Sequence, residues 1–138
     1  MALFCIALFF SAVTGCSKKK NYSDLQNQMN GWANTLKNRD YAGYRAFEAY
    51  PKAPDQFAEM YREYYISDIT VVDVSSQSDP RKSAEGRLFT EKTVTFGADI
   101  IMRSDGRRIP SSGTVELVNF SDAGQKWMIA DKMITRKK

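Results

Sequence analysis

The sequence predicts a single α+β domain in which helices come first and an antiparallel sheet follows. Between residues 25 and 64, apolar residues recur every three or four positions, as on one face of a helix. From residue 65 the apolar period changes to two and β-branched residues become frequent, as in strands. Helices and strands are thus grouped along the chain instead of alternating, which is the order of an α+β fold.

The first predicted helix begins at residues 23–26 (SDLQ), which have the spacing of a capping box with Ser23 as the cap. Its apolar residues recur at steps of four, three and four positions. They are Leu25, Met29, Trp32 and Leu36. One face of this helix is therefore expected to be buried.

Two shorter helices are predicted between residues 40 and 64. Asp40 suits the N-cap of the second helix, which Pro51 ends. Pro54 suits the first turn of the third helix, and Asp55 favours the positive end of that helix. The apolar faces consist of Tyr41, Tyr44 and Phe47 in the second helix and of Phe57, Met60, Tyr61 and Tyr64 in the third.

The sheet is predicted to have mainly four strands. Residues 66–74 form the first, and a polar loop that contains proline follows over residues 75–86. Residues 87–103 form a long second strand in which Gly97 marks a candidate bulge. Asp105 and Gly106 then supply a hairpin turn.

The third and fourth strands are predicted over residues 113–120 and 126–135, with a turn at residues 121–124 between them. Trp127 and Ile129 share one face of the last strand and are expected to lie in the core.

This layout resembles the nuclear transport factor 2-like superfamily over residues 23–136. Three segments carry the resemblance, namely residues 38–41 (NRDY), 113–117 (GTVEL) and 124–129 (GQKWMI). The resemblance implies a cone-shaped α+β fold in which a curved sheet wraps a long helix and leaves a pocket, and it makes a homodimer through the sheet plausible. Members include isomerases, dehydratases, secretion-system subunits and envelope proteins of unknown role, so the fold does not define a function.

An uncharged apolar run over residues 2–13 ends in residues 13–16 (VTGC), and residues 17–20 (SKKK) follow at once. This pattern resembles the signal of bacterial lipoproteins, in which a cysteine, here Cys16, is acylated with palmitate or a similar chain. The alternatives are a cleaved signal without a lipid and an ordinary buried segment. The run is too short to cross the ~30 Å hydrocarbon core of a bilayer.

The lipoprotein interpretation divides the chain into a signal peptide (residues 1–15), a lipidated cysteine with a basic tether (16–22) and one domain (23–138). The protein would be anchored in the bacterial cell envelope. Where the envelope has two membranes, Ser17 directly after the cysteine, in place of an aspartate, favours the outer one. The tether lysines Lys18, Lys19 and Lys20 would lie near anionic lipid headgroups or act as a solvated spacer.

The composition excludes several kinds of chemistry. The chain has no histidine, and its two cysteines are Cys5, in the apolar run, and Cys16. Ser-His-Asp and Cys-His catalysis are therefore excluded, and we expect neither a metal site nor a cofactor. Of the net charge of +4, Lys18, Lys19 and Lys20 supply three, and the sequence has no basic stripe with interleaved aromatics, so nucleic acid is not an expected partner.

Six of the seven tyrosines fall between residues 41 and 65, which suggests either a pocket or a partner surface. The alternative is that these rings simply fill the core between the helices and the sheet. The candidate pocket residues are Trp32, Tyr44, Tyr61, Tyr64, Asp99 and Asp131.

Asp131 and Asp99 are the candidates for acid/base chemistry of the ketosteroid isomerase type. Asp131 shares parity with Trp127 and Ile129, so in an unbroken strand it would face the interior. Asp99 turns inward only if Gly97 carries a bulge. The alternative places one aspartate at a rim, paired with Arg or Lys, and the other in solvent.

The sequence therefore favours a domain that binds a small apolar or peptide ligand, or a partner protein, without catalysis. The alternatives are a subunit of an envelope or secretion assembly and a histidine-free isomerase or dehydratase. The charged hairpin tip with Arg103, Arg107 and Arg108 is expected to be solvated, although it could bind an anion. An open pocket lined by Tyr and Asp would favour ligand binding or catalysis, whereas a cone filled by its own side chains, with an exposed apolar patch of several hundred Å², would favour the partner protein.

Overall fold

The computed structural model describes residues 21–124 and 126–136. Residues 1–20, which include the predicted signal, Cys16 and the three tether lysines, lie outside the described residues. In the part of the chain that is described, no helix has the length and apolarity needed to cross a membrane.

Helix α2 (Ser23–Lys37) begins at the predicted residue but is capped differently. Tyr22 is the N-cap residue and makes no side-chain capping bond, whereas the N–H of Ser23 donates to Oδ1 of Asn21 at 2.9 Å. The capping box predicted at Ser23 is therefore wrong, because Ser23 is already helical and the N-cap lies one residue earlier, at Tyr22. The buried face of the helix is as predicted at Met29, Trp32 and Leu36.

Helices α3 (Tyr41–Phe47) and α4 (Pro54–Met60) confirm the two short helices, but both are shorter than predicted. α3 ends before Pro51 is reached, and Tyr64, expected on the third helix, is the first residue of a strand. Asp40 is the N-cap of α3, and its Oδ1 accepts a hydrogen bond from the N–H of Gly43 at 3.0 Å. Pro54 occupies the first turn of α4, as its fixed φ favours.

The sheet consists of β1 (Tyr64–Val74), β2 (Arg81–Lys82), β3 (Leu88–Met102), β4 (Arg108–Phe120) and β5 (Trp127–Arg136). Its strand order is β1-β3-β4-β5, the two-residue β2 pairs with β3, and all pairs are antiparallel. β2 was not predicted, and the third long strand begins at Arg108 instead of at the predicted residue 113. The four long strands otherwise match the predicted order.

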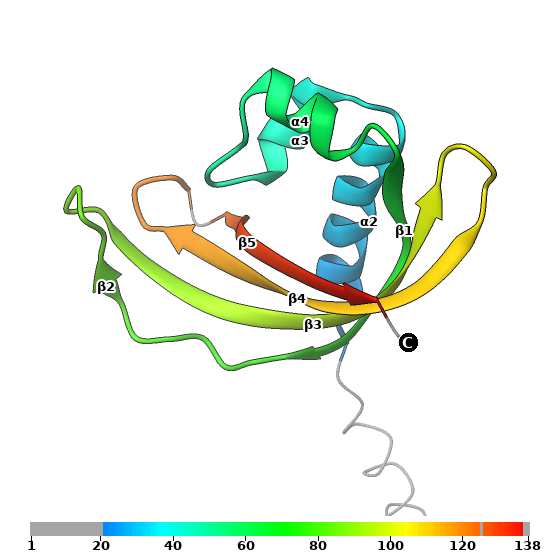
Figure 1. Cartoon of the computed structure of the whole chain (residues 1–138). Helices are drawn as coiled ribbons and strands as arrows, with labels where there is room; N and C mark the ends of the chain where they lie inside the picture. The colour runs from blue at the N-terminus through cyan, green and yellow to red at the C-terminus, as the bar shows by residue number, and fades with distance from the viewer. Residues whose placement is uncertain (1–20, 125, 137–138) are drawn as a thin grey trace, which may run out of the picture.

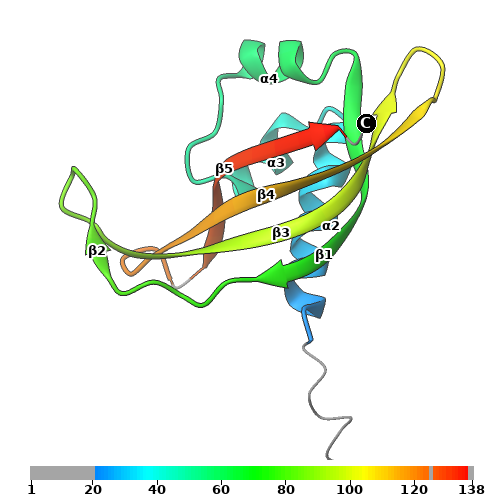
Figure 2. The ribbon, with the colours of Figure 1, turned by 60° about the horizontal axis from the view of Figure 1, so that its bottom comes forward.

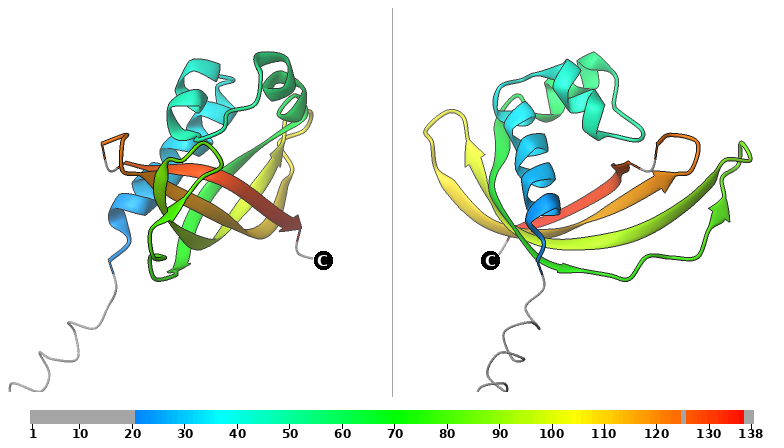
Figure 3. Two further views of the ribbon diagram at one scale, coloured as in Figure 1. Left: turned by 90° about the vertical axis from the view of Figure 1, so that its left-hand side faces the viewer. Right: turned by 180° about the vertical axis from the view of Figure 1, so that it is seen from behind.

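The sheet is strongly curved, and all three helices lie on its concave side (Figures 1 and 2). Helix α2 lies against the β1 half of that face, while α3 and α4 lie beyond the C-terminal end of α2 (Figure 3). Alternate side chains of β3 face the helices and are buried. They are Val94, Phe96, Ala98 and Ile100.

Register irregularities occur in β1 and β5 and not at Gly97. The pairing of β3 with β4 is continuous from Phe89 to Ile101, so the bulge expected at Gly97 is absent from that ladder. β1 has register shifts between Ser67 and Thr70 and between Val71 and Asp73. In β5, Ile129 pairs with Leu117 but Asp131 pairs with the adjacent Glu116, which leaves Ala130 as an extra residue.

Candidate functional site

The aromatic residues of the predicted pocket fill the concave side of the sheet. Trp32, Tyr44 and Tyr61 expose 0%, 1% and 4% of their surface. The ring of Phe57 lies 4.5 Å from that of Tyr44 and 5.5 Å from that of Tyr61. Trp32, Tyr44 and Tyr61 are thus core residues and not the lining of an open pocket, and the half-buried Tyr64 packs against them.

Burial determines the protonation of the two deepest phenols. Desolvation raises the pKa of Tyr61 and that of Tyr44 above the ordinary tyrosine range. The hydroxyl of Tyr44 accepts a hydrogen bond from the N–H of Lys52 at 3.2 Å, which ties α3 to the loop before α4. Both side chains are therefore neutral at physiological pH.

A buried ion pair lies beside these aromatic rings. Nζ of Lys132 is 2.5 Å from Oε1 of Glu48, and the Glu48 side chain is only 2% exposed. The indole N–H of Trp32 donates to the same Oε1 at 3.1 Å. The arrangement joins α2, the end of α3 and β5. The ion pair could not be predicted from the alternation of side chains along β5, because Lys132 faces inward only when Ala130 is an extra residue.

The same extra residue places Asp131 on the opposite face from the one expected. Asp131 is exposed, and its Oδ1 accepts a hydrogen bond from the N–H of Lys132 at 2.9 Å. The prediction that Asp131 faces the interior is therefore wrong. Side chains alternate between faces only in an unbroken strand, and β5 is broken at Ala130.

Asp99 lies on the convex face of the sheet, where it pairs with arginine. Its Oδ2 is 3.1 Å from Nη1 of Arg108, and the same nitrogen is 2.5 Å from Oδ2 of Asp68. The hydrogen bond from Arg108 is the main cause that lowers the pKa of Asp68. The alternative expectation of an aspartate paired with arginine is confirmed for Asp99, and the two aspartates do not form an interior acid/base site.

Arg103 supports α2 and does not belong to a solvated hairpin tip. Its guanidinium donates to the carbonyls of Leu36 at 2.7 Å, Lys37 at 3.0 Å and Tyr61 at 3.0 Å. A cation is favourable at a helix C-terminus, where carbonyl groups lack helical partners. The expectation of a solvated tip is wrong for Arg103.

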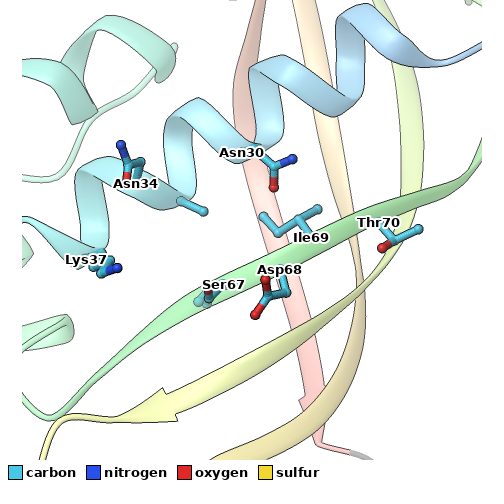
Figure 4. Close-up of a pocket in the computed structure, with 9 residues that line it drawn as sticks. Asn30, Asn34, Lys37, Ser67, Asp68, Ile69 and Thr70 are labelled. Carbon is cyan, nitrogen blue, oxygen red and sulfur yellow. The ribbon is translucent and has the colours of Figure 1, made fainter. Parts of the chain in front are cut away.

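One surface groove lies between α2 and β1 and has a volume of about 390 Å³; we call it the α2–β1 groove (Figure 4). It includes Asn30, Asn34 and Lys37 from the helix and Ser67, Asp68 and Thr70 from the strand. These side chains carry amide, ammonium, hydroxyl and carboxylate groups. The groove is therefore suited to hydrogen bonding.

A second groove, which we call the Trp127 groove, has a volume of about 450 Å³ at the other end of the sheet. Leu88, Phe89 and Trp127 provide its apolar lining, and Thr90 and Asn119 are among its polar residues. The ammonium of Lys92 lies 4.1 Å from the centre of the Trp127 ring, and desolvation lowers its pKa. Trp127, expected in the core, is only half-buried.

Among the residues that the structure describes, no group of three or more His, Cys, Asp or Glu side chains could hold a metal ion.

Comparisons with known proteins identify no family for this chain. No family model matches it, and no curated protein matches it. Among solved structures, it is similar to the intermembrane space region of the chloroplast protein ARC6, with a TM-score of 0.40 and 14% identity. That match covers 86% of this chain and 99% of the other.

Proposed function

We propose that this protein is a lipid-anchored protein of the bacterial cell envelope, and that its domain has the nuclear transport factor 2-like cone and binds a segment of a partner protein without catalysis. One observation carries the binding role. The space between the helices and the sheet is filled by the protein's own side chains, while hydrogen-bonding groups line the surface groove between α2 and β1. Such a molecule is better suited to a partner on its surface than to a substrate inside.

The proposed anchor is Cys16, with Lys18, Lys19 and Lys20 near anionic headgroups. Its test is the incorporation of labelled palmitate in a bacterial host, combined with membrane fractionation. Cys16→Ser should lose both the label and the association with membranes. Cys5→Ser, in the part of the signal that is removed, is the matched control and should retain both. A labelled Cys16→Ser variant would contradict the anchor.

The proposed partner is to be identified by crosslinking in cells that make the full chain, followed by purification and mass spectrometry. A defined second protein, for example a component of an envelope or secretion assembly, would support the proposal. Crosslinks that join only two copies of this chain would contradict it in favour of a homodimer.

A second candidate function is the binding of a small apolar ligand in the Trp127 groove. Its support is the half-buried Trp127 ring beside Leu88, which is 43% exposed. Native mass spectrometry of the detergent-extracted chain distinguishes the two candidates. A defined extra mass released on denaturation would favour the ligand, whereas a bare chain would favour the partner protein. Acid/base catalysis has less support, since Asp99 and Asp131 lie outside the interior.

A further inference from the structure

The α2–β1 groove lies beside a sheet edge. β1 is the first strand in the order β1-β3-β4-β5, and within the described residues only β3 pairs with it. The edge of a strand presents main-chain N–H and C=O groups that can pair with another chain. In the groove this edge runs from Ile66 to Thr70, alongside the polar side of α2 (Figure 4).

A side-chain amide already binds one end of this edge. Gln26 of α2 donates from Nε2 to the carbonyl of Ile69, and its Oε1 accepts a hydrogen bond from the N–H of Val71 at 2.8 Å. The two main-chain groups belong to residues two positions apart, which is the spacing at which a neighbouring strand bonds an edge. Gln26 therefore stands where a peptide group of an added strand would stand.

The strand is also irregular where it forms the wall of the groove. Asp68 has φ of +52°, in the left-handed region, and it lies within the register shift between Ser67 and Thr70. Residues other than glycine are uncommon in this conformation, and they are found in it preferentially at binding and switch sites. Arg108 holds the Asp68 carboxylate on the side of Asp99.

The end of the groove at the C-terminus of α2 is cationic. Lys37 lines the groove. It also borders a neighbouring depression together with Arg103. Arg39 lies near Arg103, and its charge contributes to the lowered pKa of Arg103. None of the three forms an ion pair with a carboxylate in the described part of the chain. The charge of Lys37 contributes to the lowered pKa of Asp68, but Arg108 pairs with that carboxylate, so this end remains complementary to a negative charge on a partner.

We propose that the α2–β1 groove binds an extended segment of a partner protein as an additional strand on β1, with an acidic side chain of that segment at Lys37. The inference rests on the proposed function and specifies its site and its ligand. The main chain of the segment pairs with β1 between Ile66 and Asp68, ahead of Gln26. Asn30 and Asn34 offer their amides from the other side.

The dimensions of the groove agree with a short added strand. Asn30 and Lys37 are seven residues apart, which is about 10 Å along a helix at ~1.5 Å per residue. A strand rises ~3.3 Å per residue, so this distance accommodates about three residues. Recognition therefore depends on main-chain pairing and one charged contact, which gives a low affinity. A low affinity is sufficient for a partner held at the same membrane, because tethering raises its effective concentration.

The test uses the full chain, labelled with ¹⁵N in detergent micelles, and two acetylated, C-terminally amidated peptides. Their sequences are Thr-Val-Thr-Val-Glu-Glu and Thr-Val-Thr-Val-Lys-Lys. The acidic peptide should shift the main-chain amide signals of residues 66–69 and the side-chain amides of Asn30 and Asn34, and should bind at least tenfold more tightly than the basic one. The same acidic peptide with N-methylated main-chain amides should not bind, because it lacks the donors of a strand.

Two charge-reversal variants complete the test. Lys37→Glu should reverse the preference between the peptides, whereas Lys82→Glu, on the exposed β2, should leave it unchanged. Equal binding of both peptides, binding of the N-methylated peptide, or the absence of any shift would overturn the inference. Shifts confined to the Trp127 groove would overturn this site while leaving the proposed partner binding to be decided by crosslinking.

Discussion

On the concave face of the sheet Glu48 and Lys132 form an ion pair beneath the helices, whereas on the convex face Arg108 bridges Asp68 and Asp99 in contact with water. The Glu48 side chain is 2% exposed and that of Arg108 is 60% exposed. Water screens the convex network and solvates each member when its partner is removed. Water cannot solvate Glu48 in the same way, so loss of Lys132 alone would leave a buried carboxylate without a cation.

The largest expected effect comes from breaking the concave pair. Lys132→Met should lower the free energy of unfolding by about 3 kcal/mol, because it leaves a buried carboxylate without its cation. The double variant Glu48→Gln with Lys132→Met should recover most of this loss. Urea unfolding of the wild type and both variants measures the effect, and a Lys132→Met variant as stable as the wild type would refute the assigned role.

A second comparison uses one glycine on each face. A Cβ at Gly113, on the concave face, would lie 2.9 Å from the Phe96 ring, and it would also clash with the carbonyl oxygen of Met133. Gly113→Ala should therefore cost about 2 kcal/mol, as overpacked sites do. At Gly97, on the convex face, a Cβ would meet no atom within 4 Å, so Gly97→Ala is the control. Equal effects in urea unfolding would contradict the difference between the faces.

Alkaline pH should also act through the concave face. Burial raises the pKa of Tyr61, so above pH ~10 the unfolded chain loses this proton while the folded chain keeps it. Stability should fall by about 1.4 kcal/mol per pH unit there on account of this group. Tyr61→Phe should reduce the slope, measured by urea unfolding between pH 9 and 11. Tyr50→Phe, at a tyrosine that is 60% exposed, should leave the slope unchanged.

The smallest expected effect is on the convex face. Arg108→Gln should leave the free energy of unfolding within error of the wild type, since its ion pairs are exposed. It should nevertheless raise the pKa of Asp68 toward the ordinary aspartate range, because the hydrogen bond from Arg108 is the main cause that lowers it. NMR titration of the Asp68 carboxyl measures this change, and an unaltered titration would show that another group holds Asp68.

Local signals in the sequence were enough to predict most elements of the fold. Pro54 at the first turn of α4, Asp40 at the N-cap of α3 and the turn at Asp105 and Gly106 each act over a few residues, so a single segment reveals them. The two-residue β2 was missed because it depends on pairing with β3, and no pattern within residues 81–82 indicates it.

The candidate site was harder to predict, because it depends on pairing between strands. An extra residue at Ala130 exchanges the faces of Asp131 and Lys132, and the sequence of β5 shows no sign of it. The bulge in β1 at Asp68 and the Gln26 amide on the β1 edge are likewise visible only once the strands and α2 are packed together.

By itself, the sequence determined the α+β order, the buried face of α2 and the lack of histidine chemistry, since periodicity, turn residues and composition are properties of the chain alone. Only the tertiary structure decided which charges are buried and which grooves remain at the surface. Burial depends on the register of neighbouring strands, and one extra residue in a strand reverses the face of every side chain beyond it.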